Sequence, residues 1–97
     1  MSGSTVVVKI GTSSITDADG VINRSVVDKL CREVAAGRAL GHRVVVVTSG
    51  AIAAGLPELG LGGERRPSDA ITLQAVATVG QSTLMGVYRE SFAFHGL

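Results

Sequence analysis

The chain has 97 residues, which is the size of one small domain. Its 45% share of hydrophobic residues is that of a globular protein, and with only 3% aromatic residues its core must be aliphatic. The net charge is only +1, and the basic residues are scattered rather than gathered into the basic stripe that nucleic-acid binding needs, so we expect no nucleic-acid partner.

Cys31 is the only cysteine, so no disulfide can form within the chain, which fits a reducing cytoplasm. The sequence does not open with a basic and then apolar signal peptide. No apolar run reaches the roughly 18 residues of a membrane span. We therefore expect a soluble, cytoplasmic protein without a membrane partner.

The first predicted element is a buried strand over residues 5–10, a β-branched run that ends abruptly at Gly11. Beyond it, two short β-prone segments, residues 14–16 and 21–22, flank an Asp-Gly pair at positions 19 and 20. An Asp-Gly pair between such segments is typical of a tight turn. The sequence therefore predicts a small hairpin here.

A helix is predicted next, with Asn23 or Ser25 as its N-cap and Asp28 completing a capping box with Ser25. Apolar residues recur at helical spacing from position 26 to 35 and form one stripe that should face the core. Gly41 is the predicted C-cap.

A second buried strand follows over residues 44–47. With the first strand and the intervening helix it makes a β-α-β unit, whose strands should be parallel and joined by a right-handed crossover. A short helix is then predicted from Ala51 to about Ala54, ending near Gly55 and Pro57.

A glycine-rich, charged loop is expected over residues 56–67, followed by a last helix over about residues 70–93 with Ser68 or Asp69 as its N-cap. The apolar residues of this helix cover more than one face, which is typical of a helix that packs on two sides. Three polar residues fall within this largely buried segment, where we expect them to bind neighbouring loops or line a subunit contact: Gln74, Gln81 and Ser82.

Two parallel strands do not form a stable sheet by themselves, and parallel sheets are normally covered on both faces. We therefore expect the chain to be the front part of a larger α/β protein, or partner chains to complete the sheet.

Lys9 stands near the end of an otherwise apolar strand. Alone, it is an ordinary strand-end lysine whose ammonium group reaches solvent. Gly11 and Thr12 follow, however, and these small residues leave backbone N–H groups accessible. A lysine beside such groups can neutralise charge on a transferred phosphoryl group.

Ser49 and Gly50 lie at the carboxyl end of the second strand, where open α/β sheets bind their ligands. The N-terminus of the next helix carries partial positive charge and free N–H groups. Ser49 is predicted to cap this helix, to offer its hydroxyl to a substrate carboxylate, or both. Gly50 would let a ligand approach the backbone.

Three standard motifs are absent. Gly11 does not open a dinucleotide-binding G-x-G-x-x-G, the glycines at 50 and 55 lack the Lys-Ser of a P-loop, and Ser49 lacks the glycines of a hydrolase elbow. No His, Cys and carboxylate set has the spacing of a metal site, so no metal ligand is predicted. His42 and His95 are expected to be solvated or capping residues.

Three strings stand in order along the chain: VVKIGTS at 7–13, VVTSGAIAAG at 46–55 and QAVATVGQS at 74–82. Together they closely resemble the opening third of the L-glutamate-specific members of the amino acid kinase family, and the resemblance covers essentially the whole chain. It implies a three-layer α/β/α sandwich, of which only the N-terminal β-α-β-α-α part is present. Residues 1–97 would form the glutamate-binding part of the kinase domain, with the nucleotide-binding half absent.

The resemblance implies ATP-dependent phosphorylation of the L-glutamate γ-carboxylate to γ-glutamyl phosphate, the first step of proline biosynthesis. It also implies Mg²⁺ bound with the nucleotide, proline as a feedback inhibitor of the complete enzyme, and a homo-oligomer. Lys9 matches the family's catalytic, phosphate-contacting lysine, and Gly11 and Thr12 complete the ATP phosphate contacts. Ser49 matches the residue that binds glutamate, with Gly50 and Ala51 supplying nearby backbone.

The family's downstream aspartate and asparagine, which complete the glutamate site, have no counterpart in these 97 residues, so we expect the chain to be inactive by itself. Two alternatives stay open. The chain is a non-catalytic assembly fragment, or it belongs to another amino acid kinase such as carbamate kinase, which should not carry the TSGAIAAG string.

Overall fold

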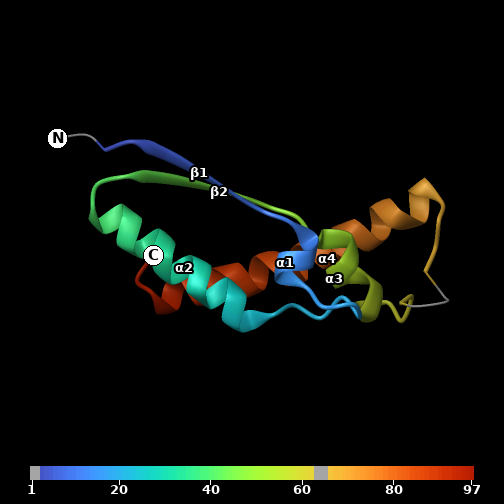
Figure 1. Cartoon of the computed structure of the whole chain (residues 1–97). Helices are drawn as coiled ribbons and strands as arrows, with labels where there is room; N and C mark the ends of the chain where they lie inside the picture. Colours follow the sequence, from blue (N-terminus) through green and yellow to red (C-terminus); the bar gives the residue numbers. More distant parts are fainter. Residues whose placement is uncertain (1–2, 63–65) are drawn as a thin grey trace.

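Figure 1 shows the computed structural model, which describes residues 3–62 and 66–97. Two strands and four helices follow one another along the chain: β1 (Thr5–Ile10), α1 (Thr12–Ile15), α2 (Arg24–Ala39), β2 (Arg43–Thr48), α3 (Ala51–Glu58) and α4 (Ala70–Phe94). Both predicted strands and the three predicted helices are confirmed. The single-turn helix α1 was not predicted.

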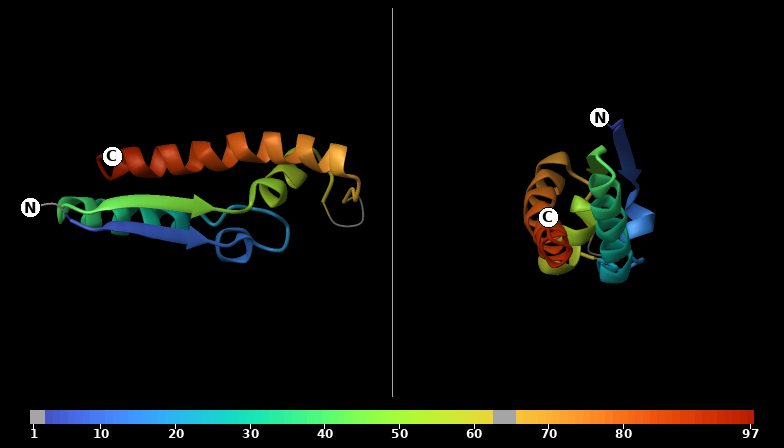
Figure 2. Two further views of the ribbon diagram at one scale, coloured as in Figure 1. Left: turned by 90° about the horizontal axis from the view of Figure 1, so that it is seen from above. Right: turned by 90° about the vertical axis from the view of Figure 1, so that its left-hand side faces the viewer.

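The two strands pair in parallel, as predicted, with Val6 opposite Val44 and Ile10 opposite Thr48. The α2 helix connects them, and both α2 and α4 lie against the same face of the sheet (Figures 1 and 2). The chain is therefore of the α/β class, with a small parallel sheet and one layer of helices.

The core lies between this face of the sheet and the two long helices. Its buried side chains come mainly from α2 and α4, with Ile15 inserted from α1; the set comprises Ile15, Val27, Leu30, Cys31, Val34, Leu84, Val87 and Tyr88. Val8 and Ile10 of β1 pack against it, as do Val44 and Val46 of β2. Cys31, which falls within the predicted apolar stripe of residues 26–35, is fully buried.

The opposite face of the sheet carries apolar side chains that no described residue covers. Because side chains alternate along a strand, Val7, Val45 and Val47 point away from the core. They are 64%, 48% and 46% exposed, respectively. Parallel sheets are normally covered on both faces. Within the described residues, helices cover only one face of this sheet.

The N-cap of α2 is Asn23, whose side chain accepts a hydrogen bond from the Val26 amide. Ser25 donates its hydroxyl to the Asn23 side chain and lies inside the helix, so the predicted capping box between Ser25 and Asp28 is wrong. Asp28 instead points toward α4, where its carboxylate contacts His95.

The α3 helix continues to Glu58 and passes through Gly55 and Pro57, where the sequence predicted its end. Pro57 lacks the N–H that would bond the Ala53 carbonyl one turn earlier. Gly20 of the hairpin lies against that carbonyl oxygen, and a side chain at position 20 would collide with it. The glycine-rich loop consequently begins later than predicted, and its residues 63–65 lie outside the described part of the chain.

Asp69 is the N-cap of α4, as predicted, and accepts a 2.9 Å hydrogen bond from the Thr72 amide. The first turns of α4 extend past the sheet (Figure 2), and α3 packs against the later part of α4 around Val76 and Gly80. Ile71, predicted to be part of the apolar surface, is consequently 81% exposed. The three polar residues expected within a buried segment are also exposed: Gln74, Gln81 and Ser82.

Candidate functional site

The two loops singled out from the sequence meet at the carboxyl end of the sheet. The parallel register brings Lys9 beside Val47. One step further, the Ser49 amide donates a 2.9 Å hydrogen bond to the Ile10 carbonyl. The residues after β1 and those after β2 therefore leave the sheet side by side, as the ligand-binding edge of an open α/β sheet requires.

Lys9 is exposed on the bare face of the sheet, because its neighbour Ile10 points into the core. The ammonium group forms no ion pair with any described residue. Its charge is therefore free to act on an anion at the strand end.

Gly11 and Thr12 begin the short α1 helix rather than an open loop. Gly11 has an extended backbone and is the residue before the first turn. Within the described chain, the amides of Thr12 and Ser13 have no protein acceptor, as expected for the first turn of a helix. The turn exists because Ile15 at its end is fully buried in the core.

The turn from β2 into α3 is built around Gly50. Gly50 is buried and has φ of 108°, a left-handed conformation that glycine adopts without strain. It is the N-cap residue of α3, so the prediction that Ser49 caps this helix is wrong. The hydroxyl of Ser49 is exposed and bonds no described residue, while Ala51 is half-buried in the first turn.

Tyr88 of α4 supports this turn from the core side, and sequence reasoning missed it. Its hydroxyl lies 2.9 Å from the hydroxyl of Thr48, the last residue of β2. Burial raises the pKa of the Tyr88 phenol, so the group keeps its proton. The sequence offered only an apolar position on a helix, which reveals packing but not a hydrogen bond to a residue 40 positions away.

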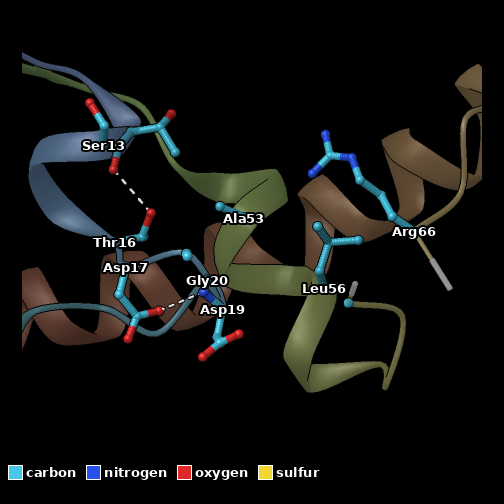
Figure 3. Close-up of a pocket in the computed structure, with 11 residues that line it drawn as sticks. Ser13, Thr16, Asp17, Asp19, Gly20, Ala53, Leu56 and Arg66 are labelled. Atoms are coloured by element: carbon cyan, nitrogen blue, oxygen red, sulfur yellow. Dashed lines mark hydrogen bonds between the residues drawn. The ribbon is translucent and has the colours of Figure 1, made fainter. Parts of the chain in front are cut away.

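An open cleft of about 920 Å³ adjoins the α1 turn (Figure 3). Thr12 and Ser13 line one side, Ala53 and Leu56 of α3 another, and Arg66 a third. The hairpin that follows α1 completes the wall with residues 16–20. Lys9 and the Ser49–Gly50 turn do not line the cleft. The cleft therefore adjoins the site at the strand ends but does not enclose it.

The hairpin itself is confirmed in a shorter form. A single antiparallel bridge joins Thr16 and Ile22. The Asp17 carboxylate accepts hydrogen bonds from the amides of Asp19 (2.8 Å) and Val21 (3.0 Å), which fixes the tight turn. The role of the Asp17 carboxylate is therefore structural: it stabilises the turn.

Neither histidine belongs to a site. His42 accepts a hydrogen bond from the Ser4 amide, and His95 pairs with Asp28. Among residues 3–62 and 66–97, no group of three or more His, Cys, Asp or Glu side chains lies close enough to hold a metal ion. In the same ranges, no helix combines the length and apolar character needed to cross a bilayer.

Comparison with known proteins agrees with this geometry. The model of the amino acid kinase family matches residues 4–97. The chain is 52% identical to the glutamate 5-kinase of Salinispora arenicola over 92 residues, 95% of this chain and 24% of the relative. It is 46% identical to the glutamate 5-kinase of Pelobacter propionicus over 92 residues, with the same shares. The chain thus spans about a quarter of the length of the curated relatives it matches. It belongs to the amino acid kinase family.

Proposed function

We propose that this chain supplies the acceptor-binding part of a kinase that transfers the γ-phosphoryl group of ATP to the γ-carboxylate of L-glutamate. The product is γ-glutamyl phosphate, and the reaction would open proline biosynthesis in the cytoplasm. The observation that carries the proposal is the 2.9 Å hydrogen bond from the Ser49 amide to the Ile10 carbonyl. It joins a lysine-containing strand end to a serine-glycine turn, so that a phosphoryl donor and its acceptor would be neighbours.

On the donor side, we assign the phosphates of ATP to Lys9, Gly11 and Thr12. The residues fit such a group: Lys9 forms no ion pair with a described residue, and the Thr12 and Ser13 amides of the turn that follows the strand lack acceptors within the described chain. These are the donors that phosphate oxygens prefer. Mg²⁺ would arrive with the nucleotide and neutralise phosphate charge.

On the acceptor side, we assign L-glutamate to Ser49, Gly50 and Ala51. The exposed Ser49 hydroxyl has no partner among the described residues and would donate to a substrate carboxylate. The positive end of α3 adds partial charge at Ala51. Gly50 is buried with its Cβ position toward Ile15 and Thr16, so its part in binding would be made by its backbone.

In the reaction, an oxygen of the γ-carboxylate attacks the γ-phosphorus while the bond to the β,γ-bridging oxygen breaks, and ADP leaves. The chain's part in this step is positioning and charge stabilisation, since phosphoryl transfer needs little covalent help. Lys9 would neutralise charge on the moving phosphoryl group, which makes it the catalytic residue of this part. The Ser49–Gly50 turn would hold the attacking carboxylate in line.

The chain spans about a quarter of its relatives, and we expect the remaining residues of such a kinase to complete both binding sites. We therefore expect no turnover from the 97 residues alone. Homo-oligomeric assembly and feedback inhibition by proline are expected of the complete enzyme. The bare face of the sheet around Val7 and Val45 favours one alternative, a module that acts only in assembly with other polypeptide.

The test is glutamate-dependent ADP formation by the full-length protein in the presence of ATP and Mg²⁺. A blank without glutamate measures background hydrolysis, and the isolated 97-residue chain is run in parallel. We expect turnover by the full-length protein and none by the chain alone. Absence of glutamate-dependent turnover in a folded full-length protein would overturn the proposal and favour the assembly module. Turnover with carbamate instead of glutamate would assign the chain to a different amino acid kinase.

A further inference from the structure

A short hydrogen-bond relay connects the core of the molecule to the Ser49–Gly50 turn. The Thr48 hydroxyl donates to the Ser49 carbonyl at 3.3 Å. Either hydroxyl could donate in the 2.9 Å contact between the two side chains; with the Thr48 proton on the Ser49 carbonyl, Tyr88 is the donor. The relay therefore runs from Tyr88 through Thr48 to the backbone of Ser49. Each donor polarises the next, which strengthens such a chain of hydrogen bonds.

The donor end of this relay is rigid. Tyr88 is only 4% exposed, and its ring stacks on Phe92 with 6.0 Å between the ring centroids. Burial raises the pKa of the Tyr88 phenol, which keeps the hydroxyl protonated and able to donate. The hydroxyl is thus held at a fixed point beneath the end of β2.

The α4 helix also supports the other side of the same turn. Two turns before Tyr88, Gly80 lies directly against the carbonyl oxygen of Ala51 in the first turn of α3. The Ser49 amide is held separately by Ile10 of β1. The turn is consequently fixed from the strand and, at two points, from α4.

We propose that Tyr88 is a positioning residue for the acceptor substrate, and that its hydroxyl, acting through Thr48, sets the orientation of Ser49 and Gly50. This inference rests on the proposed function, since it takes the turn to be the glutamate site. Tyr88 touches no substrate itself. A role in packing alone would need only the ring, because the ring makes the contacts with the core.

The test removes the hydroxyl and keeps the ring. In the full-length protein, Tyr88→Phe should raise the KM for glutamate about fivefold, the loss of roughly one hydrogen bond, and leave the KM for ATP unchanged. Thr48→Val breaks the same relay and should have the same effect, with no further loss in the double variant. Thr48→Ser keeps a hydroxyl and should restore the glutamate KM.

The matched control is Ser91→Ala, which deletes another hydroxyl of α4 that bonds Asp28, away from the turn. It should leave both KM values unchanged. An unchanged glutamate KM in a folded, active Tyr88→Phe protein would overturn the inference, as would an equal shift in Ser91→Ala. Additive effects of Tyr88→Phe and Thr48→Val would do the same.

A second measurement separates this inference from the proposed function. Hydrogen exchange of the Ser49 amide should be faster in Tyr88→Phe, while exchange of the Asn23 amide, which bonds the Ile15 carbonyl, should be unchanged. Faster exchange at Ser49 without any glutamate-dependent turnover in the unsubstituted protein would leave Tyr88 as a support of the turn and refute its link to glutamate. Unchanged exchange at Ser49 would refute the relay itself.

Discussion

Gly80 of α4 lies against the carbonyl oxygen of Ala51 in α3, so close that a β-carbon at position 80 would overlap it. Gly55 of α3 approaches α4 in the same way, with the Val76 carbonyl as its neighbour. The two helices therefore touch through their backbones. Because Ala51 begins the helix that follows the Ser49–Gly50 turn, this contact also sets where the turn stands relative to the core.

Gly80→Ala should accordingly destabilise the protein, by about 3 kcal/mol, because backbone and not a flexible side chain blocks the added methyl group. Chemical denaturation followed by circular dichroism measures the change. Gly86→Ala in the same helix is the matched control: nothing lies within 4 Å of its β-carbon position, so this substitution should stabilise by up to about 1 kcal/mol. Equal effects at the two positions would contradict the close contact.

The hydrogen bond between Asp28 of α2 and His95 at the end of α4 predicts a dependence of stability on pH. His95 Nε2 lies 2.8 Å from Asp28 Oδ1, and this hydrogen bond is the main reason why the pKa of Asp28 is lowered. A carboxylate whose folded-state pKa is lowered stabilises the fold above its unfolded pKa, about 3.9. That contribution is lost as the pH falls through the folded-state value.

Asp28→Asn should therefore reduce the free energy of unfolding near neutral pH, and its difference from the unsubstituted protein should shrink below about pH 4. Urea denaturation at a series of pH values measures this difference. Asp19→Asn serves as the control, because the Asp19 carboxylate has no side-chain partner within the described residues and its substitution should change little. A difference between the Asp28→Asn and unsubstituted proteins that stays constant down to pH 2 would argue against the pair.

Much of the fold followed from local patterns in the sequence. The β-branched runs predicted both strands, and the spacing of apolar residues predicted α2 and α4. What the sequence could not reveal depends on tertiary contacts. The α1 turn forms because Ile15 inserts into the core, although its segment reads as β-prone. Likewise, α3 passes through Pro57, and the Ala53 carbonyl that Pro57 cannot bond lies against Gly20 of the hairpin, a contact that local sequence does not reveal.

In the candidate site too, local sequence predicts some features and tertiary contacts determine the others. The order of residues at the two strand ends predicted Lys9 and Ser49, and the parallel register explains why their loops are neighbours. The cap of α3 was assigned to Ser49, yet the left-handed backbone of Gly50 begins the helix. Tyr88 escaped prediction because its partner Thr48 lies on a different element. Local sequence thus selected the residues of the candidate site, and long-range packing determines how they are held.

Lys9→Ala in the full-length protein should lower kcat by about a hundredfold and change the KM for glutamate much less, because the ammonium group acts on charge that develops during transfer. Steady-state kinetics with glutamate and ATP varied in turn measures both constants. Lys29→Ala removes an exposed lysine of α2 and should leave them unchanged. An equal loss in kcat and in glutamate affinity would contradict a phosphate role for Lys9.

Ser49→Ala should raise the KM for glutamate roughly 10- to 100-fold, the loss of one hydrogen bond to a charged group, with a smaller effect on kcat. Its melting temperature should equal that of the unsubstituted protein, because Ser49 makes no capping hydrogen bond to α3. Ser82→Ala, an exposed hydroxyl of α4, controls for the loss of a surface serine. A fall in melting temperature at an unchanged KM would mean that the hydroxyl stabilises the helix after all. If Ser49 binds the substrate carboxylate, the KM for glutamate rises and the melting temperature stays the same.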